Sequence, residues 1–148
     1  AKRLAGKAEF LLVGPIKHDG TKRRLKQISE NKIQFAGART HQQVIEIFRQ
    51  SRVYLQLSHY ESFGLTVPEA MACGCVPFVA RRGALPEIVG DCGYIHEPDV
   101  YELIASDLLD ALSQPSSSMD SLRERASRFS AEKRKTALLA AVEPLIRR

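Results

Sequence analysis

Short, uninterrupted apolar runs alternate with segments of helical spacing along the first 113 residues, and this alternation limits the folds open to the chain. The runs are rich in β-branched and aromatic residues, which predicts five strands, at 8–13, 33–36, 53–57, 76–80 and 93–96. Apolar residues recur at helical spacing over about 40–50 and 99–113, and residues 21–30 predict a helix with a polar face. Continuous apolar strands indicate a parallel sheet that is covered on both sides. We therefore predict an α/β fold, a Rossmann-like parallel sheet with helices on both faces.

The end of the chain has a different pattern. A polar stretch, residues 114–118, separates the alternating region from two further helical segments, about 119–129 and 131–147. We expect residues 1–113 to form the Rossmann-like domain and residues 114–148 to form C-terminal helices that pack on it. The chain opens without Met and without the apolar segment of a secretory signal, so we expect it to begin inside a longer protein.

The cysteine count and the charge limit the setting and the partners. Three cysteines form an odd set in a domain large enough to fold without disulfides, so we expect a reducing compartment, the cytoplasm. The net charge of +5 suits a phosphorylated ligand, a nucleic acid or an anionic membrane surface. Basic residues are scattered and aromatics make up only 7%, so we expect no nucleic-acid partner. Peripheral association with a membrane stays open.

Basic residues occur together at 22–24, 81–82 and 147–148, and most of them are expected to lie on solvated helix faces and ends. Arg81 and Arg82 differ, because they follow the fourth predicted strand at its carboxyl end, where α/β folds bind ligands.

Common cofactor and metal motifs are missing from the sequence. Residues 14–22 have a spacing one residue too long for a phosphate loop, with Lys and Thr in reverse order, and no Gly-x-Gly-x-x-Gly follows a predicted strand. Cys73 and Cys75 lack the gap of a zinc-ligand pair, and the chain contains no Asp-x-Asp pair that would hold a cation against a diphosphate. We expect no cofactor and no metal, and we interpret the cysteines as small buried thiols.

Residues 59–74 leave the third predicted strand and open a helix, and they contain most of the chemistry. Two carboxylates, Glu61 and Glu69, lie eight residues apart with Gly64 between them. Thr66 and Glu69 have the spacing of a capping box, which predicts Thr66 as the N-cap residue and gives Glu69 a structural role. In this interpretation Gly64 is only a turn residue.

The capping interpretation leaves Glu61 unexplained. A carboxylate in a strand-to-helix loop lies where parallel α/β sheets bind ligands. Backbone amides of residues 64–66 suit a diphosphate, and a carboxylate in the first helical turn accepts two hydrogen bonds from a vicinal diol. Ribose and hexose both offer such diols.

Glu61 and Glu69, with Ser-Phe-Gly-Leu between them, resemble the Glu-x7-Glu motif of the retaining glycosyltransferases of family 4, or group 1. Four further segments are similar to runs of that family, in the same order: 10–14, 33–37, 69–80 ("EAMA-x-G-x-P-V-V-A") and 83–93 ("GG-x-PE-I-V-x-x-x-x-G"). The resemblance covers about residues 8–113.

The resemblance implies a GT-B enzyme, in which two Rossmann-like domains face each other across the active-site cleft. This chain then forms the C-terminal half, with residues 1–113 as the nucleotide-sugar-binding domain, and the N-terminal acceptor-binding domain of the same chain as its partner. The reaction implied is the retaining transfer of a hexose from a nucleoside-diphosphate sugar to a glycan, a lipid or a small molecule.

Site residues carry over by position. The resemblance implies that Glu61 is catalytic and lies at the donor hexose, and that Glu69 binds the ribose hydroxyls. The resemblance implies further donor-binding residues. The backbones of four of them contact the sugar hydroxyls and the diphosphate: Phe63, Gly64, Leu65 and Thr66. Two others lie in the region that faces the base: Gly37 and Ala38.

The chain also departs from the family's pattern. The family's C-terminal domain opens with a further strand and helix that carry an Arg and a Lys, which neutralise the diphosphate, and this chain starts after them. We therefore expect the chain alone to be inactive and to bind a donor weakly. Two alternatives stay open, a GT-B nucleotide-sugar epimerase and a non-catalytic module that binds a protein partner.

Overall fold

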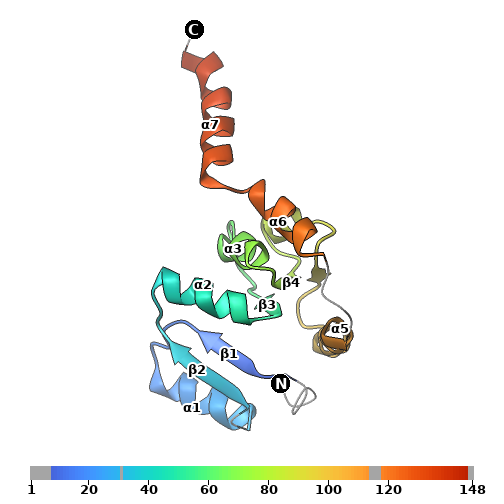
Figure 1. Cartoon of the computed structure of the whole chain (residues 1–148). Coiled ribbons are helices and arrows are strands. Elements are labelled where there is room, and N and C mark those ends of the chain that lie inside the picture. Colours follow the sequence, from blue (N-terminus) through green and yellow to red (C-terminus); the bar gives the residue numbers. More distant parts are fainter. Residues whose placement is uncertain (1–7, 31, 114–117, 147–148) are drawn as a thin grey trace. The chain divides into compact units, whose positions relative to one another are not determined.

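The computed structural model describes residues 8–30, 32–113 and 118–146 (Figure 1). The chain forms two compact units, residues 1–47 with 100–115 and residues 48–99 with 116–148. Most of the predicted polar stretch at 114–118 lies outside the described residues, as do residues 1–7.

The first unit contains the first two strands of the chain. Its elements are β1 (Phe10–Val13), α1 (Asp19–Ile28), β2 (Ile33–Gly37), most of α2 (His41–Gln50) and α5 (Tyr101–Ser113). The two strands pair in parallel, as their continuous apolar character predicts. The first predicted strand is shorter than expected, because residues 8 and 9 precede the paired segment.

Helix α2 begins with a capping box. The backbone N–H of Thr40 donates to Oε1 of Gln43 over 3.0 Å, and the N–H of Gln43 donates to Oγ1 of Thr40 over 3.3 Å. Two amides that a helix leaves without an intrahelical acceptor are therefore satisfied by neighbours in the sequence.

The second unit contains a three-stranded parallel sheet in the order β3-β4-β5. Its elements are β3 (Val53–Gln56), α3 (Thr66–Ala72), β4 (Val76–Ala80), α4 (Leu85–Val89), β5 (Tyr94–His96), α6 (Met119–Ser127) and α7 (Ala131–Ile146). The parallel sheets and their flanking helices confirm the predicted Rossmann-like α/β class.

The core of the second unit lies around β4, in which all five residues are buried. Helix α3 packs against β3 and β4, α4 packs against β4 and β5, and α6 packs against α3 and α4. The ring of Phe78 stacks on Tyr94 with centroids 4.2 Å apart. Because β3 and β4 are parallel neighbours, the loops that follow them leave the same edge of the sheet.

The C-terminal helix α7 is mostly exposed. Residues 131–141 are all exposed, and Leu138 retains 65% of its accessible surface. None of the helices in the described part of the chain is both long enough and apolar enough to cross a bilayer.

Candidate functional site

A tight turn follows β3, and the carboxylate of Glu61 closes it. Oε1 of Glu61 accepts a hydrogen bond from the backbone N–H of Gly64 over 3.1 Å, and Oε2 accepts one from Nε2 of Gln56 over 3.0 Å. A carboxylate offers about four acceptor positions, so two bonds fix its orientation and leave acceptor capacity on both oxygens.

Two glycines allow the backbone to pack closely around this turn. Gly64 has a φ of +74°, and a Cβ there would lie 2.6 Å from Cδ2 of Leu85, the first residue of α4. A Cβ on Gly83, in the loop after β4, would overlap the carbonyl oxygen of Glu61. Conformation and space both require glycine at these positions, so the turn is held by the neighbouring loop as well as by its own hydrogen bonds.

Polar side chains on β3 support the same turn. The hydroxyl of Tyr54 donates to Oε1 of Gln56 over 2.5 Å and is hydrogen-bonded to Oγ1 of Thr66 over 2.8 Å. Gln56 in turn donates from Nε2 to Oγ of Ser58 over 3.0 Å. Sequence reasoning did not assign Tyr54 and Gln56 to the site. The signal was present, because polar residues at every second position of an apolar strand face one side of the sheet.

Helix α3 starts differently from the prediction. Its N-cap residue is Leu65, in αR conformation and without a side-chain cap, so the prediction of Thr66 as N-cap is wrong. The physical reason is the hydrogen bond with Tyr54, which engages the Thr66 hydroxyl. The predicted stop is confirmed, since Gly74 follows the C-cap residue Cys73 with a φ of +95°.

The charges of Glu61 and Glu69 both act on the hydroxyl of Tyr54. Burial raises the pKa of Tyr54 above its ordinary value of 10.0, the hydrogen bond with Thr66 opposes this rise, and the charges of Glu61 and Glu69 add to it. Both carboxylates are therefore within electrostatic range of one hydroxyl group. Both side chains are half-buried, so neither is sealed inside the protein.

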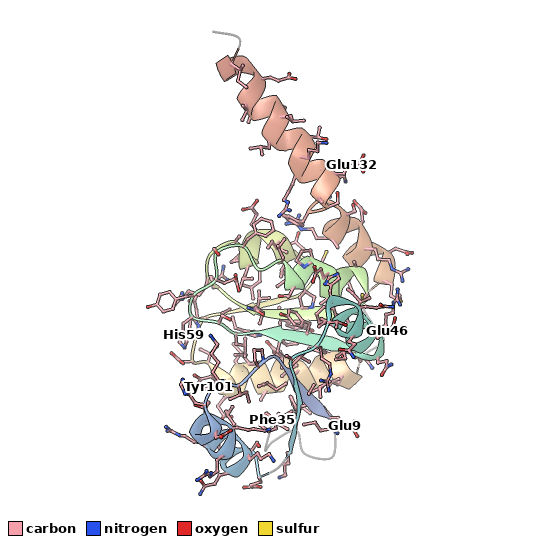
Figure 2. The ribbon with its side chains drawn as sticks, turned by 90° about the vertical axis from the view of Figure 1, so that its left-hand side faces the viewer. Glu9, Phe35, Glu46, His59, Tyr101 and Glu132 are labelled. Carbon is pink, nitrogen blue, oxygen red and sulfur yellow. The ribbon has the colours of Figure 1, made fainter. Side chains whose placement is uncertain are left out.

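A hollow of about 720 Å³ opens beside Glu61. Its lining comes from the loops after β3 and β4: His59, Tyr60, Glu61, Ser62, Arg82 and Gly83. Figure 2 labels the exposed His59 on the first of these loops. The guanidinium of Arg82 lies 4.0 Å from Oε2 of Glu97, whereas Arg81 pairs with the other oxygen of Glu97 over 2.8 Å. Arg82 follows β4 at its carboxyl end, as the sequence predicts, and the structure adds that Arg82 and Gly83 line the same hollow as Glu61.

The remaining predicted site residues fall into two groups. Phe63 is half-buried and Leu65 and Thr66 are exposed, all within the loop and first helical turn beside Glu61. Gly37 is the last residue of β2 and Ala38 follows it, in the first unit, where the carbonyl of Ala38 accepts a hydrogen bond from Nη1 of Arg39 over 3.0 Å. The donor-binding roles of both groups stay predictions.

None of the three cysteines forms a disulfide; Cys75 is buried and the other two are half-buried. Sγ of Cys75 donates to the carbonyl oxygens of Phe48 and Ser51 over 3.1 and 3.3 Å. Burial raises the pKa of Cys75 to about 12, which keeps this thiol protonated. Within the described ranges, His, Cys, Asp and Glu side chains form no group of three that would hold a metal ion.

Comparisons with known proteins place this chain in a family. A family model for "Glycosyl transferases group 1" matches residues 1–136. Over 87 residues the chain is 31% identical to O-antigen chain mannosyltransferase B of Escherichia coli, an alignment that covers 59% of this chain and 23% of that protein.

Two solved structures share the fold. Sucrose-phosphate synthase from Thermosynechococcus elongatus superposes with a TM-score of 0.80 at 23% identity, over 93% of this chain and 38% of that one. HepE of Anabaena, solved in complex with UDP-glucose, superposes with a TM-score of 0.75 at 22% identity, over 88% of this chain and 40% of that one. The chain thus spans 23–40% of the length of these three proteins. By the family match and the shared Rossmann-like fold of GT-B enzymes, it belongs to the group 1 glycosyltransferases.

Proposed function

We propose that this chain is the donor-binding part of a retaining glycosyltransferase, which transfers a hexose from a nucleoside-diphosphate sugar to a glycan, a lipid or a small molecule. The observation that carries the proposal is the carboxylate of Glu61, which two hydrogen bonds fix at the carboxyl edge of the sheet. Parallel α/β sheets bind their ligands at this edge.

Glu69 suits the ribose of the donor. It lies in the first turn of α3, and its side chain is half-buried. Two carboxylate oxygens match the two adjacent hydroxyls of a ribose. In this proposal Glu69 contributes mainly to donor affinity.

Glu61 suits the hexose. Its hydrogen bonds to Gln56 and Gly64 fix the carboxylate before a ligand arrives, so little ordering is needed on binding. The remaining acceptor capacity of both oxygens is available to sugar hydroxyls. In this proposal Glu61 orients the reacting face of the sugar and therefore affects turnover more than affinity.

The diphosphate needs hydrogen-bond donors and positive charge. Within the described ranges, the backbone amides of Leu65 and Thr66 have no backbone acceptor, whereas that of Gly64 donates to Glu61. Arg82 lines the hollow beside Glu61, and its guanidinium donates to the carbonyl oxygen of Arg81 over 2.9 Å. These groups support the binding of a diphosphate beside the turn, and Gly37 and Ala38 are proposed to face the base.

The reaction breaks the bond between the hexose and the diphosphate, which places positive charge on the sugar and negative charge on the leaving group. The retaining family's usual account has the leaving diphosphate take the acceptor's proton on the same face of the sugar. The protein's task is then to hold the two reactants and to stabilise the developing charges. We propose that an N-terminal domain of the same chain binds the acceptor, that the enzyme works in the cytoplasm, and that the C-terminal half alone is inactive.

A thermal-shift panel tests the proposal on the full-length protein. The panel contains UDP-glucose, GDP-mannose and ADP-glucose, each beside its nucleoside diphosphate. We expect one base to be selected, with a stabilisation of about 2.7 kcal/mol at a ligand concentration of about 100 Kd. The anomeric configuration of the transferred sugar, read by NMR, then tests retention. No shift with any donor contradicts donor binding, and an inverted product contradicts the retaining mechanism.

A further inference from the structure

The side chain of Phe63 points from the middle of the Glu61–Gly64 turn to the C-terminal helices. The ring of Phe129 meets it edge-to-face, with centroids 6.3 Å apart and planes at 71°. The guanidinium carbon of Arg134 lies 5.8 Å from the centroid of the same ring. Figure 2 labels Glu132 in the first turn of α7, two residues before Arg134. Phe129 and Arg134 thus hold the turn, although they lie 66 and 71 positions after Phe63 in the sequence.

Arg125 connects this contact to α4. Its guanidinium carbon lies 5.7 Å from the centroid of the Phe129 ring. Nε of Arg125 donates to the carbonyl oxygen of Ile88 over 2.9 Å, and Nη2 donates to the carbonyl oxygen of Glu87. These carbonyls belong to the end of α4, where a cation is favourable and acceptors need donors. We name Arg125, Phe129 and Arg134 the C-terminal clamp.

The clamp holds the turn in two ways. Phe129 and Arg134 contact Phe63 directly, and Arg125 fixes the end of the short helix whose first residue, Leu85, lies against Gly64. Phe63 and Phe129 are half-buried, so their contact excludes water on one side only. Edge-to-face rings and cation–π pairs prefer defined geometries, and such contacts orient a loop more strictly than general apolar packing does.

We propose that the C-terminal clamp positions the Glu61–Gly64 turn for donor binding, so that residues 125–134 contribute to the affinity for the nucleotide sugar. The inference rests on the proposed function. Phe129 and Arg134 act through Phe63, Arg125 acts through α4, and all three are positioning residues. Loss of the clamp lets the turn populate other conformations, and only the fraction with the correct geometry binds the donor.

The test compares Phe129→Ala with Phe129→Tyr in the full-length protein. The alanine variant removes the ring contact to Phe63 and the ring beneath Arg125, and the tyrosine variant retains both. We expect Phe129→Ala to raise the Kd for the donor that the panel selects, UDP-glucose, GDP-mannose or ADP-glucose, by about 5- to 10-fold. We expect Phe129→Tyr and Arg134→Lys to stay within about twofold of wild type, because each keeps its contact.

A control variant, Phe10→Ala, and two measurements, the donor Kd and hydrogen exchange, separate an effect on the position of the turn from a general loss of stability. Phe10→Ala removes another half-buried phenylalanine, one that lies outside the clamp, and is expected to lower Tm without changing the Kd. Hydrogen exchange of the Gly64 amide, which donates to Glu61, is expected to become faster in Phe129→Ala and to stay unchanged in Phe10→Ala.

Failure of the inference differs from failure of the proposed function. A wild-type protein that binds a donor and a Phe129→Ala variant that binds it equally well overturn the clamp alone. A wild-type protein that binds none of the donors overturns both. Weaker binding and faster Gly64 exchange in Phe129→Ala, restored in Phe129→Tyr, support the clamp.

Discussion

Two turns in this chain share a local sequence signature, and only one of them uses it. Threonine is followed three residues later by a glutamine or a glutamate after β2 (Thr40 and Gln43) and after β3 (Thr66 and Glu69). The first pair forms a capping box. At the second turn, Leu65 is the N-cap residue and the Thr66 hydroxyl is bonded to Tyr54. At the first turn the two side chains of the signature therefore cap their own helix, whereas at the second turn Tyr54, 12 residues earlier, engages the threonine hydroxyl.

Glycines in the two turns differ in the same way. Gly37 and Gly64 have nearly equal φ values, +70° and +74°. A Cβ on Gly37 would meet nothing within 4 Å, whereas one on Gly64 would meet Leu85 at 2.6 Å. The turn after β2 needs glycine for conformation alone, and the turn after β3 needs it for conformation and space. Residues distant in the sequence therefore restrict the backbone of the turn that contains Glu61 more than that of the turn after β2.

Replacing each glycine by alanine gives the largest contrast. We expect Gly64→Ala to lower the free energy of unfolding by about 3 kcal/mol or more, the sum of left-handed strain and overpacking against Leu85. Gly37→Ala is expected to cost about 1 kcal/mol, from strain alone. Urea unfolding measures both variants. Equal losses would show that the space around Gly64 relaxes, and the contrast between the turns would then be only conformational.

Glu61→Ala tests the chemistry of the second turn. Its loss frees the Gly64 amide and removes the carboxylate proposed to face the hexose, so we expect kcat to fall by about 100-fold and the Kd for the donor to rise by less than about tenfold. Release of the nucleoside diphosphate by the full-length protein reports kcat, and calorimetry reports the Kd. Thr40→Ala, in the other turn, is the control with unchanged kcat. A normal kcat in Glu61→Ala would remove Glu61 from the reaction.

Glu69 and Gln43 occupy equivalent positions of the shared signature, and they are expected to respond differently. Hydrogen bonds to a charged group contribute about 1.5–3 kcal/mol, so Glu69→Ala is expected to weaken donor binding by about 10- to 100-fold. Gln43→Ala is expected to lower stability by about 0.5 kcal/mol and to leave donor binding unchanged. Calorimetry on both variants gives the comparison. Unchanged donor affinity in Glu69→Ala would contradict its role at the ribose.

Local features of the sequence predicted most of the fold. The apolar run Val76–Ala80 became β4 with the predicted bounds, because a strand buried on both faces needs apolar residues at every position. Glu61, Gly64 and Glu69 were predicted as site residues for a similar reason, since their spacing within one loop and one helical turn is visible in the sequence, and their roles stay predictions.

Features that depend on strand pairing were not visible. Arg82 and Gly83 reach the turn because β4 lies beside β3, and no local pattern states that order. The clamp residues follow 60 or more positions after Glu61, so only tertiary packing brings them to Phe63. The wrong N-cap prediction at Thr66 has the same origin, because a tyrosine 12 residues earlier holds the hydroxyl that the capping box requires.

The two threonines give the smallest and most direct test of the comparison. Thr40→Ala removes an N-cap side chain and is expected to cost about 1 kcal/mol in urea unfolding. Thr66→Ala removes one of two partners of the Tyr54 hydroxyl, which keeps Gln56 as its acceptor, and the exposed side chain is easily replaced by water. We therefore expect a loss of no more than about 0.5 kcal/mol. The reverse order would mean that Thr66 caps α3 in solution, and the local signature would then govern both turns.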